Sequence, residues 1–168
     1  MDRRRFLASC SSALPLAVAG CSDYLGDNSI SVTDWNELHE VRENTDGAYR
    51  LTADLDAETA GYDDHVRGDD GWQPIGWQQE TFLGAFDGNG HTISDLAIDR
   101  PDATGVGLFG RMTGEITDLT LANCDIVGGR KTGALVGIST GGTITGVSVS
   151  GSVNGTEKVG GITGSSED

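Results

Sequence analysis

The sequence predicts an all-β protein built as a solenoid, in which the chain coils repeatedly and each coil packs on the next. A short glycine-bounded motif occurs three times, and its closing glycines, Gly110, Gly137 and Gly164, are 27 residues apart. A fixed spacing of about 20–50 residues is typical of solenoids, whose repeats bury their apolar faces only against one another. A repeated apolar pattern between the motifs and a high glycine content, 26 of 168 residues, support the same prediction.

The apolar pattern favours strands over helices. It has the spacing i, i+3, i+5 and occurs in Ile93–Leu96–Ile98, Ile116–Leu119–Leu121 and Ile144–Val147–Val149. A helical face would continue at i+4 and i+7, so a strand with a corner at Asp95, Asp118 or Gly146 fits better. Stacked copies would then place Ile93, Ile116 and Ile144 in one ladder, about 4.8 Å apart.

Glycines allow the turns between these strands to be tight, because glycine adopts positive φ and lets two backbones approach closely. We expect the repeat turns to depend on Gly107, Gly110, Gly133, Gly137, Gly160, Gly161 and Gly164. A flexible glycine-rich linker is the alternative interpretation, but linkers lack a phased Ile/Leu/Val pattern.

The N-terminal part predicts a cap for the solenoid. Ile30–Val32 can form a first strand, and Asp34 is placed to start a helix as its N-cap with Glu37 as its capping-box partner. The apolar face of this helix, with helical spacing, would consist of Trp35, Leu38 and Val41. A helix here would cover the open end, where strands otherwise expose unpaired backbone.

Tyr49–Leu55 predicts the first coil strand, and the irregular stretch 57–79 follows it. We expect a hydrophobic plug against the first coils, formed by Trp72, Pro74, Ile75 and Trp77.

At this point the motifs resemble a known family. Gly107-Leu108-Phe109-Gly110 matches the GLUG motif (glycine, leucine, any residue, glycine), and Gly133–Gly137 and Gly160–Gly164 are variants of it. The run Phe82–Ile93 looks like the segment that leads into such repeats, and the resemblance covers about residues 30 to 164. It implies a right-handed parallel β-helix of the pectin-lyase-like type. Proteins with this motif are mostly secreted or surface-displayed, including adhesins and non-catalytic regions of secreted proteases, and the motif itself carries no catalytic residue.

Residues 1–20 predict an export signal, with a basic start, a short apolar run and small residues before Cys21. Arg3 and Arg4 followed by Phe6 and Leu7 resemble the twin-arginine export signal. The residues before Cys21 resemble a lipobox, which predicts that Cys21 becomes a lipid-modified first residue. A membrane-spanning helix is the alternative, but the apolar run from residue 6 to 19 is shorter than the roughly 20 residues needed.

The predicted organisation is therefore a signal at 1–20, a polar acidic tether at 21–29, a cap and first coil at 30–80, and β-helix coils at 81–168. Because the sequence stops just after the third glycine turn, we expect a shortened relative of a longer protein; the alternative is that the last acidic residues act as a crude cap. An uncapped last coil would favour self-association through its open strands.

The net negative charge of the chain restricts the molecules that it can bind. Loss of residues 1–20 would remove three arginines and one aspartate, changing the net charge from −15 to −17. So acidic a surface disfavours nucleic acid and anionic lipid headgroups as partners. It indicates a salt-loving source, where salt screens the repulsion between carboxylates. Cys124, the cysteine left in the mature chain, lies between apolar residues and is expected to be a small buried side chain.

Several side chains could carry chemistry, and each has a plainer interpretation. Asp95 and Asp118 could pair as acid and base, but two corner carboxylates accepting turn hydrogen bonds are expected instead. Lys131 and Lys158 are in phase and could hold an acidic polysaccharide, yet a solvated strand edge is favoured. Asn154 begins an Asn-Gly-Thr sequon and could carry an N-linked glycan.

The irregular stretch also contains candidates. Four aspartates, Asp63, Asp64, Asp69 and Asp70, could bind Ca²⁺, but their spacing is not that of an EF-hand. His65 has no partner at metal-ligand spacing, and we expect it to be a solvated loop histidine.

These observations predict a lipid-anchored protein on the outer face of the cell membrane with an adhesive, binding or envelope-structural role. Its expected partners are the membrane, reached through the lipid, together with surface glycans or other envelope proteins. We expect no catalytic residues, no metal and no cofactor. The alternative is a polysaccharide lyase or glycoside hydrolase, which would need carboxylates, or an acid and a base, clustered in a groove on one face; a fold alone does not decide this.

Overall fold

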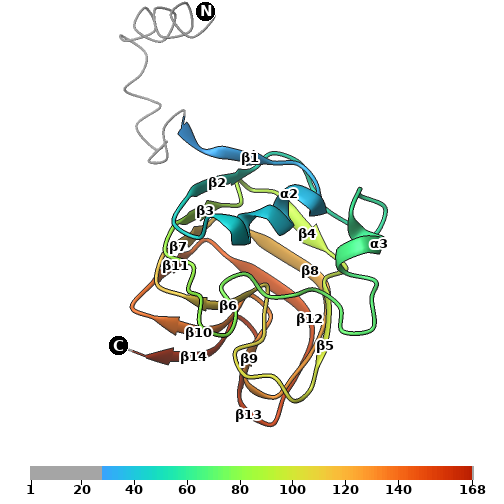
Figure 1. Cartoon of the computed structure of the whole chain (residues 1–168), viewed down its shortest axis with the longest axis vertical. Helices are drawn as coiled ribbons and strands as arrows, with labels where there is room; N and C mark the ends of the chain where they lie inside the picture. The colour runs from blue at the N-terminus through green and yellow to red at the C-terminus, as the bar shows by residue number, and fades with distance from the viewer. Residues whose placement is uncertain (1–27, 168) are drawn as a thin grey trace, which may run out of the picture.

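The computed structural model describes residues 28–167, which form parallel β-sheets with a few short helices at one end (Figure 1). The first sheet has the order β1 (Ile30–Val32), β2 (Ala48–Leu51), β3 (Ala85–Asp87), β7 (Glu115–Thr117) and β11 (Thr143–Thr145). In the second sheet β8 (Thr120–Gly128) lies between β12 (Ser148–Asn154) and the pair β4 (Thr92–Ser94) and β5 (Ala97–Arg100). The third sheet contains β6 (Phe109–Met112), β10 (Val136–Thr140) and β14 (Thr163–Glu167), and the fourth contains β9 (Arg130–Gly133) and β13 (Glu157–Gly160).

The chain passes through these sheets in a repeating order. Strands β7, β8, β9 and β10 follow one another, and β11, β12, β13 and β14 then repeat the same path. Each strand of the second circuit pairs in parallel with its counterpart in the first, at an offset of 28 residues for Glu115 with Thr143 and 27 for Val136 with Thr163. The all-β prediction is confirmed, and the 27-residue glycine spacing is the offset between paired strands of the third sheet.

The core runs between the sheets as apolar columns. Phe86, Ile116 and Ile144 are register partners in the first sheet, and Ile93, Leu121 and Val149 are partners in the second. Full burial of a leucine or isoleucine side chain contributes about 1.5–3 kcal/mol, so these columns are a main source of stability. The last member of each column, Ile144 or Val149, is only half-buried.

The predicted ladder of Ile93, Ile116 and Ile144 is wrong in its first member. Ile116 and Ile144 do stack, but Ile93 pairs with Leu121 and belongs to another sheet. The reason is that the spacing i, i+3, i+5 occurs twice along one circuit, in Ile116–Leu119–Leu121 and again in Leu121–Cys124–Ile126. Ile93 and Ile98 pair with Leu121 and Ile126, so their triplet matches the second occurrence, and Phe86 is the partner of Ile116.

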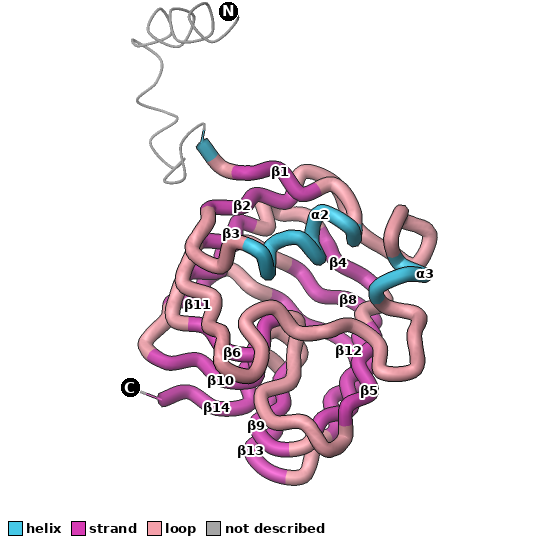
Figure 2. The backbone as a smooth tube through the Cα atoms, viewed as in Figure 1, coloured by secondary structure: helices cyan, strands magenta, loops and turns pink. Residues whose placement is uncertain are grey.

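The N-terminal end carries the helices, which Figure 2 shows beside β1 to β4 and away from β13 and β14. Helix α2 (Trp35–Glu40) continues into the 3-10 turn η3 (Val41–Glu43), and α3 (Tyr62–His65) packs beside it. The backbone N–H of Glu37 donates to Asp34 Oδ1 at 2.9 Å, so the predicted N-cap is confirmed. The Glu37 carboxylate, however, accepts from the backbone and hydroxyl of Thr33 rather than from Asp34.

The predicted apolar faces of this end are confirmed. Trp35, Leu38 and Val41 are fully buried, and so are Trp72 and Ile75 of the plug. The Trp35 and Trp72 rings lie 5.6 Å apart, which joins the helix to the plug. No helix in residues 28–167 has the length and apolarity to cross a bilayer, since α2 has six residues and α3 has four.

Candidate functional site

The residues predicted to direct export and anchoring lie outside the described part of the chain. These are Arg3, Arg4, Phe6, Leu7 and Cys21. Their roles stay predictions.

The glycines of the repeat motifs lie where circuits contact each other. Gly110, Gly137 and Gly164 occupy equivalent positions in the third sheet, Gly133 and Gly160 end β9 and β13, and Gly107 and Gly161 lie in the turns before β6 and β14. A Cβ on Gly137 would lie 2.4 Å from the carbonyl carbon of Gly105 in the preceding circuit. The position therefore has room for glycine alone, and its contribution is to packing rather than chemistry.

Left-handed corners of the backbone also stack. Asp95 and Asn123 have φ of 61° and 52°, and the neighbouring strand pairs place them at the same corner of successive circuits. Asp118 and Gly146, with φ of 49° and 65°, form a different corner. The predicted equivalence of Asp95 and Asp118 is therefore wrong, for the same reason as the misplaced Ile93.

The carboxylate of Asp95 is used in structural hydrogen bonds. Its Oδ1 accepts from Asn123 Nδ2 at 2.6 Å, and its Oδ2 accepts from the backbone N–H of Ala57 at 3.3 Å. The sequence predicts turn hydrogen bonds within the corner for this carboxylate, whereas the two donors are 28 and 38 residues away along the chain, so the bonds join neighbouring circuits.

Lys131 and Lys158 occupy equivalent positions, as their 27-residue phase predicts, since Arg130 pairs with Glu157 and Thr132 with Val159. Both have positive φ, and the preceding circuit has Gly105 at this corner. Lys131 Nζ lies 2.5 Å from Glu167 Oε1. The Glu167 carboxyl has its pKa lowered, mainly by this hydrogen bond and by the charge of Lys131.

Asn154 lies at the end of β12 with an exposed side chain, whose Nδ2 donates to Ser152 Oγ at 3.0 Å. The sequon is thus accessible from solvent.

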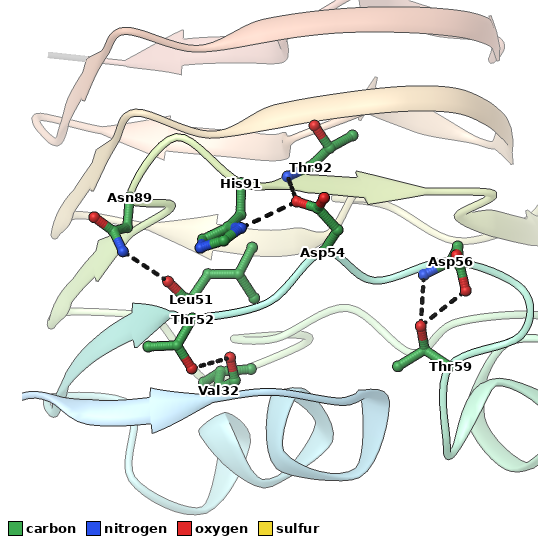
Figure 3. A network of polar contacts seen from close by, with 9 residues as sticks. All are labelled: Val32, Leu51, Thr52, Asp54, Asp56, Thr59, Asn89, His91 and Thr92. Atoms are coloured by element: carbon green, nitrogen blue, oxygen red, sulfur yellow. Dashed lines mark hydrogen bonds and ion pairs between the residues drawn. The ribbon is translucent and has the colours of Figure 1, made fainter.

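A polar network attaches the cap to the second sheet (Figure 3). Asp54 Oδ1 accepts from the backbone N–H of Thr92 at 2.9 Å and lies 3.1 Å from His91 Nδ1. The bond from Thr92, followed by the one from His91, lowers the pKa of Asp54. These contacts attach the chain after β2 to β4.

The acidic loop does not gather its carboxylates. Asp63 pairs with Arg67 at 2.7 Å, and Asp70 lies 3.8 Å from Arg100. Within residues 28–167, no group of three or more His, Cys, Asp or Glu side chains is arranged to hold a metal ion.

His65 is not the solvated loop histidine that the sequence suggested. Its ring stacks on His39 at 4.1 Å between centroids, and His39 in turn meets the edge of Trp72. Burial, with help from the charges of Arg42 and His65, lowers the pKa of His39 to about 4. The two rings are 26 residues apart in the sequence, and no local pattern indicates their contact.

Cys124 is buried, as predicted, and burial raises the pKa of its thiol to about 11. A thiol with so high a pKa is protonated near neutral pH and is therefore a poor nucleophile.

Among the cavities on the surface of residues 28–167, a large and a smaller one border residues that the sequence singled out. One, of about 690 Å³, is bordered by Tyr62, Asp95, Asn123, Asp125 and Ser152. The other, of about 350 Å³, lies between the loop containing Trp77 and the turn before β6, and is bordered by Trp77, Gln78, Thr104 and Arg111 over a floor that includes Gly110 and Ile138. Asp95, which the sequence offers as a candidate acid or base, and Arg111 thus line different cavities. Trp77, predicted as part of the plug, instead borders the same cavity as Arg111, and no pattern in the sequence indicates this.

Comparison with known proteins gives two partial similarities. The chain is 38% identical over 116 residues to halomucin of Haloquadratum walsbyi, an alignment that covers 66% of this chain and 1% of halomucin. It is 34% identical over 106 residues to a putative Gly-rich membrane protein of Evansella cellulosilytica, covering 62% of this chain and 12% of that protein. The chain thus spans only a small part of the length of either relative. No family model matches the sequence, and no solved structure matches it significantly.

Proposed function

We propose that this chain is an exported cell-surface or envelope protein of a salt-loving organism, with a non-catalytic adhesive, binding or structural role. The observation that carries the proposal is its similarity to halomucin and to a Gly-rich membrane protein. The net charge of −15 supports it, because a surface rich in carboxylates stays hydrated and soluble at high salt.

The proposed architecture is a right-handed parallel β-helix of the GLUG and pectin-lyase-like type. Its support is the repeated path through four sheets and the offsets of 27 and 28 residues between paired strands. Such a body is rigid, because every inner strand is paired on both sides, and its outward side chains form fixed rows that a partner can bind.

Twin-arginine export and a lipid on Cys21 would place this body on the outer face of the cell membrane. Replacement of Cys21 by serine tests the anchor, with Cys124→Ser as the control because Cys124 is buried in the core. We expect the native protein and the control in the membrane fraction and Cys21→Ser in the medium. If Cys21→Ser stays in the membrane fraction, the lipid anchor is refuted. An Arg3→Lys/Arg4→Lys variant should remain in the cytoplasm, and its export would refute the twin-arginine route.

Asn154 is proposed as a glycan acceptor because its sequon is exposed. The intact mass of protein from the native host should exceed the sequence mass, and Asn154→Gln should remove the excess. An identical mass for the two proteins would refute this part of the proposal.

The outer edge of β11 to β13 is proposed to contact a second copy of the chain. Val159 of β13 and Ile162 in the turn after it are 43% and 38% exposed, and Ile144 and Val149 are half-buried. The segment 141–156, which contains β11 and β12, has no charged residue, so this part of the edge lacks the carboxylates that would repel a second copy. Light scattering should show a mass that rises with concentration, and Val149→Lys should abolish the rise; a constant monomer mass would contradict it.

Polysaccharide cleavage is tested in parallel. A lyase or glycosidase would need its acid and base in one groove, and within residues 28–167 Asp95 and Arg111 border separate cavities. We therefore expect no reducing or unsaturated ends when the purified protein is incubated with acidic or neutral polysaccharides. Their release would replace the non-catalytic proposal.

A further inference from the structure

Trp77 differs from the other two tryptophans of the chain. Trp35 and Trp72 are fully buried, whereas Trp77 is half-buried and borders the 350 Å³ cavity. The Arg100 guanidinium lies 4.9 Å from the centroid of the Trp77 ring, and Arg100 is itself held by the carbonyl of Trp72. These contacts hold the indole in position at the cavity wall.

Arg111 is the charged residue of this cavity, and it differs from the other arginines in residues 28–167. The side chains of Arg42, Arg50, Arg67, Arg100 and Arg130 each form a hydrogen bond or ion pair with another described residue. Arg111 is exposed, and no side-chain partner for it is present among the described residues. In a chain with 26 acidic and 11 basic residues, an unpaired guanidinium beside a cavity is unusual and is available for an anion from outside.

The floor of the cavity is rigid backbone. Gly110 N–H donates to Ile75 O at 2.7 Å, and Arg111 N–H donates to Gly76 O at 2.8 Å, so the Trp77 loop is hydrogen-bonded to β6. Gly76 has a φ of 68°, and a Cβ there would lie 2.6 Å from the Arg111 carbonyl oxygen. Trp77 and Arg111 are thus presented from backbone segments bonded directly to each other, which fixes their separation.

We propose that this cavity binds a pyranose ring that carries a carboxylate, such as a uronate residue of an acidic polysaccharide. Arg111 would bind the carboxylate through two parallel N–H donors, the geometry that guanidinium groups favour. Trp77 would pack against the apolar C–H face of the ring, while Gln78 and Thr104, both at the rim, would bond its hydroxyls. A volume of about 350 Å³ is at the lower end of the roughly 300–1,000 Å³ range of small-ligand sites.

Each simpler ligand would leave part of the site unused. A free inorganic anion would need Arg111 but not the indole, and a neutral sugar would need the indole but not the guanidinium. The general repulsion between an acidic polysaccharide and an acidic protein is screened at high salt, because the Debye length is about 3 Å at 1 M. Contact pairing at Arg111 survives this screening better than long-range repulsion does, so high salt favours the complex.

The experiment titrates the purified protein with trigalacturonate and, as the matched ligand, with galactotriose, which has a hydroxymethyl group in place of each carboxylate. Calorimetry gives the affinity, and tryptophan emission reports the site, because Trp77 is the tryptophan that solvent reaches. We expect trigalacturonate to bind at least about tenfold more tightly than galactotriose, the usual effect of a charge-assisted hydrogen bond. Arg111→Gln should remove that difference, and Trp77→Leu should weaken both ligands.

Arg130→Gln is the control, since Arg130 is also exposed but pairs with Glu157 away from the cavity. It should bind as the native protein does, and circular dichroism checks that all variants are folded. Equal affinity for the two ligands, absence of trigalacturonate binding, or an equal loss in Arg111→Gln and Arg130→Gln would overturn the proposal. This inference rests on the proposed surface role. The two are tested separately, because ligand binding by the purified protein tests the cavity and membrane fractionation of Cys21→Ser tests the surface location.

Discussion

Asn123 Nδ2 donates a hydrogen bond of 2.6 Å to Asp95 Oδ1, and the two residues form the same left-handed corner in successive circuits. The bond therefore joins one circuit to the next at the point where the strand turns. Asn is suited to this corner, because its short polar side chain tolerates positive φ better than most side chains do.

Substitution at Asn123 separates the side-chain bond from the backbone strain. Asn123→Ala should lower the free energy of unfolding by about 1–3 kcal/mol, since it removes the hydrogen bond and places alanine at positive φ. Asn123→Gly should cost less, because glycine relieves the strain while still losing the bond. Chemical denaturation measures both, and an alanine variant as stable as the glycine variant would contradict the assigned corner.

Gly137 and Gly161 give a matched test of close backbone contact. A Cβ at Gly137 would meet backbone atoms of Gly105 and Val106 at 2.4 and 2.5 Å, whereas a Cβ at Gly161 has nothing within 4 Å. Gly137→Ala should lower the stability by about 3 kcal/mol, the upper part of the usual range for overpacking. Gly161→Ala should change it by less than about 0.5 kcal/mol. Equal thermal shifts for the two variants would show that the circuits are not packed as described.

The apolar column of Ile93, Leu121 and Val149 predicts a gradient of stability. Leu121 is fully buried between its two neighbours, and Val149, at the outer edge, is half-buried. Leu121→Ala should cost about 2–5 kcal/mol, the usual loss for a large-to-small core substitution. Val149→Ala should cost less than half as much, because it removes fewer methyl groups from a partly solvated site. Urea unfolding curves give both values, and a larger effect at Val149 would be inconsistent with this burial.

His39 should make stability depend on pH. Its pKa in the folded protein is lowered from 6.5 to about 4, so between these values the unfolded chain binds more protons than the folded one. The contribution of neutral His39 is complete above about pH 6.5 and is lost as the pH falls through about 4. The midpoint of thermal unfolding should therefore fall in this window, and less steeply in His39→Gln. Identical pH profiles for the two proteins would show that His39 titrates normally.

The local features of the sequence predicted the local structure well. The N-cap at Asp34, the buried face of Trp35, Leu38 and Val41, and the equal phase of Lys131 and Lys158 all follow from spacing within one segment or one repeat. These features depend on the spacing of residues within one element or repeat, and that spacing can be read from a single sequence.

The register of the first circuit could not be predicted in the same way. The apolar spacing around Ile93 matches that of Ile116, but the same spacing recurs at Leu121 and Ile126, which are the actual partners of Ile93 and Ile98. The cavity between Trp77 and Arg111 and the His39–His65 stack were missed because loops bring distant residues together. Neither pairing is visible before the circuits are in register.

The stacking of circuits is tested most directly by engineered disulfides, in a chain whose Cys21 is replaced by serine. Thr92 and Thr120 are register partners in adjacent parallel strands, which lie about 4.8 Å apart and within the range that a disulfide spans. Thr92→Cys/Thr120→Cys should form a disulfide on mild oxidation, detected by mass and by loss of free thiol. The control is Thr92→Cys/Glu115→Cys, because these two positions would be partners only if Ile93 lay beside Ile116. This pair should stay reduced. A disulfide in the second pair and none in the first would contradict the fold described here.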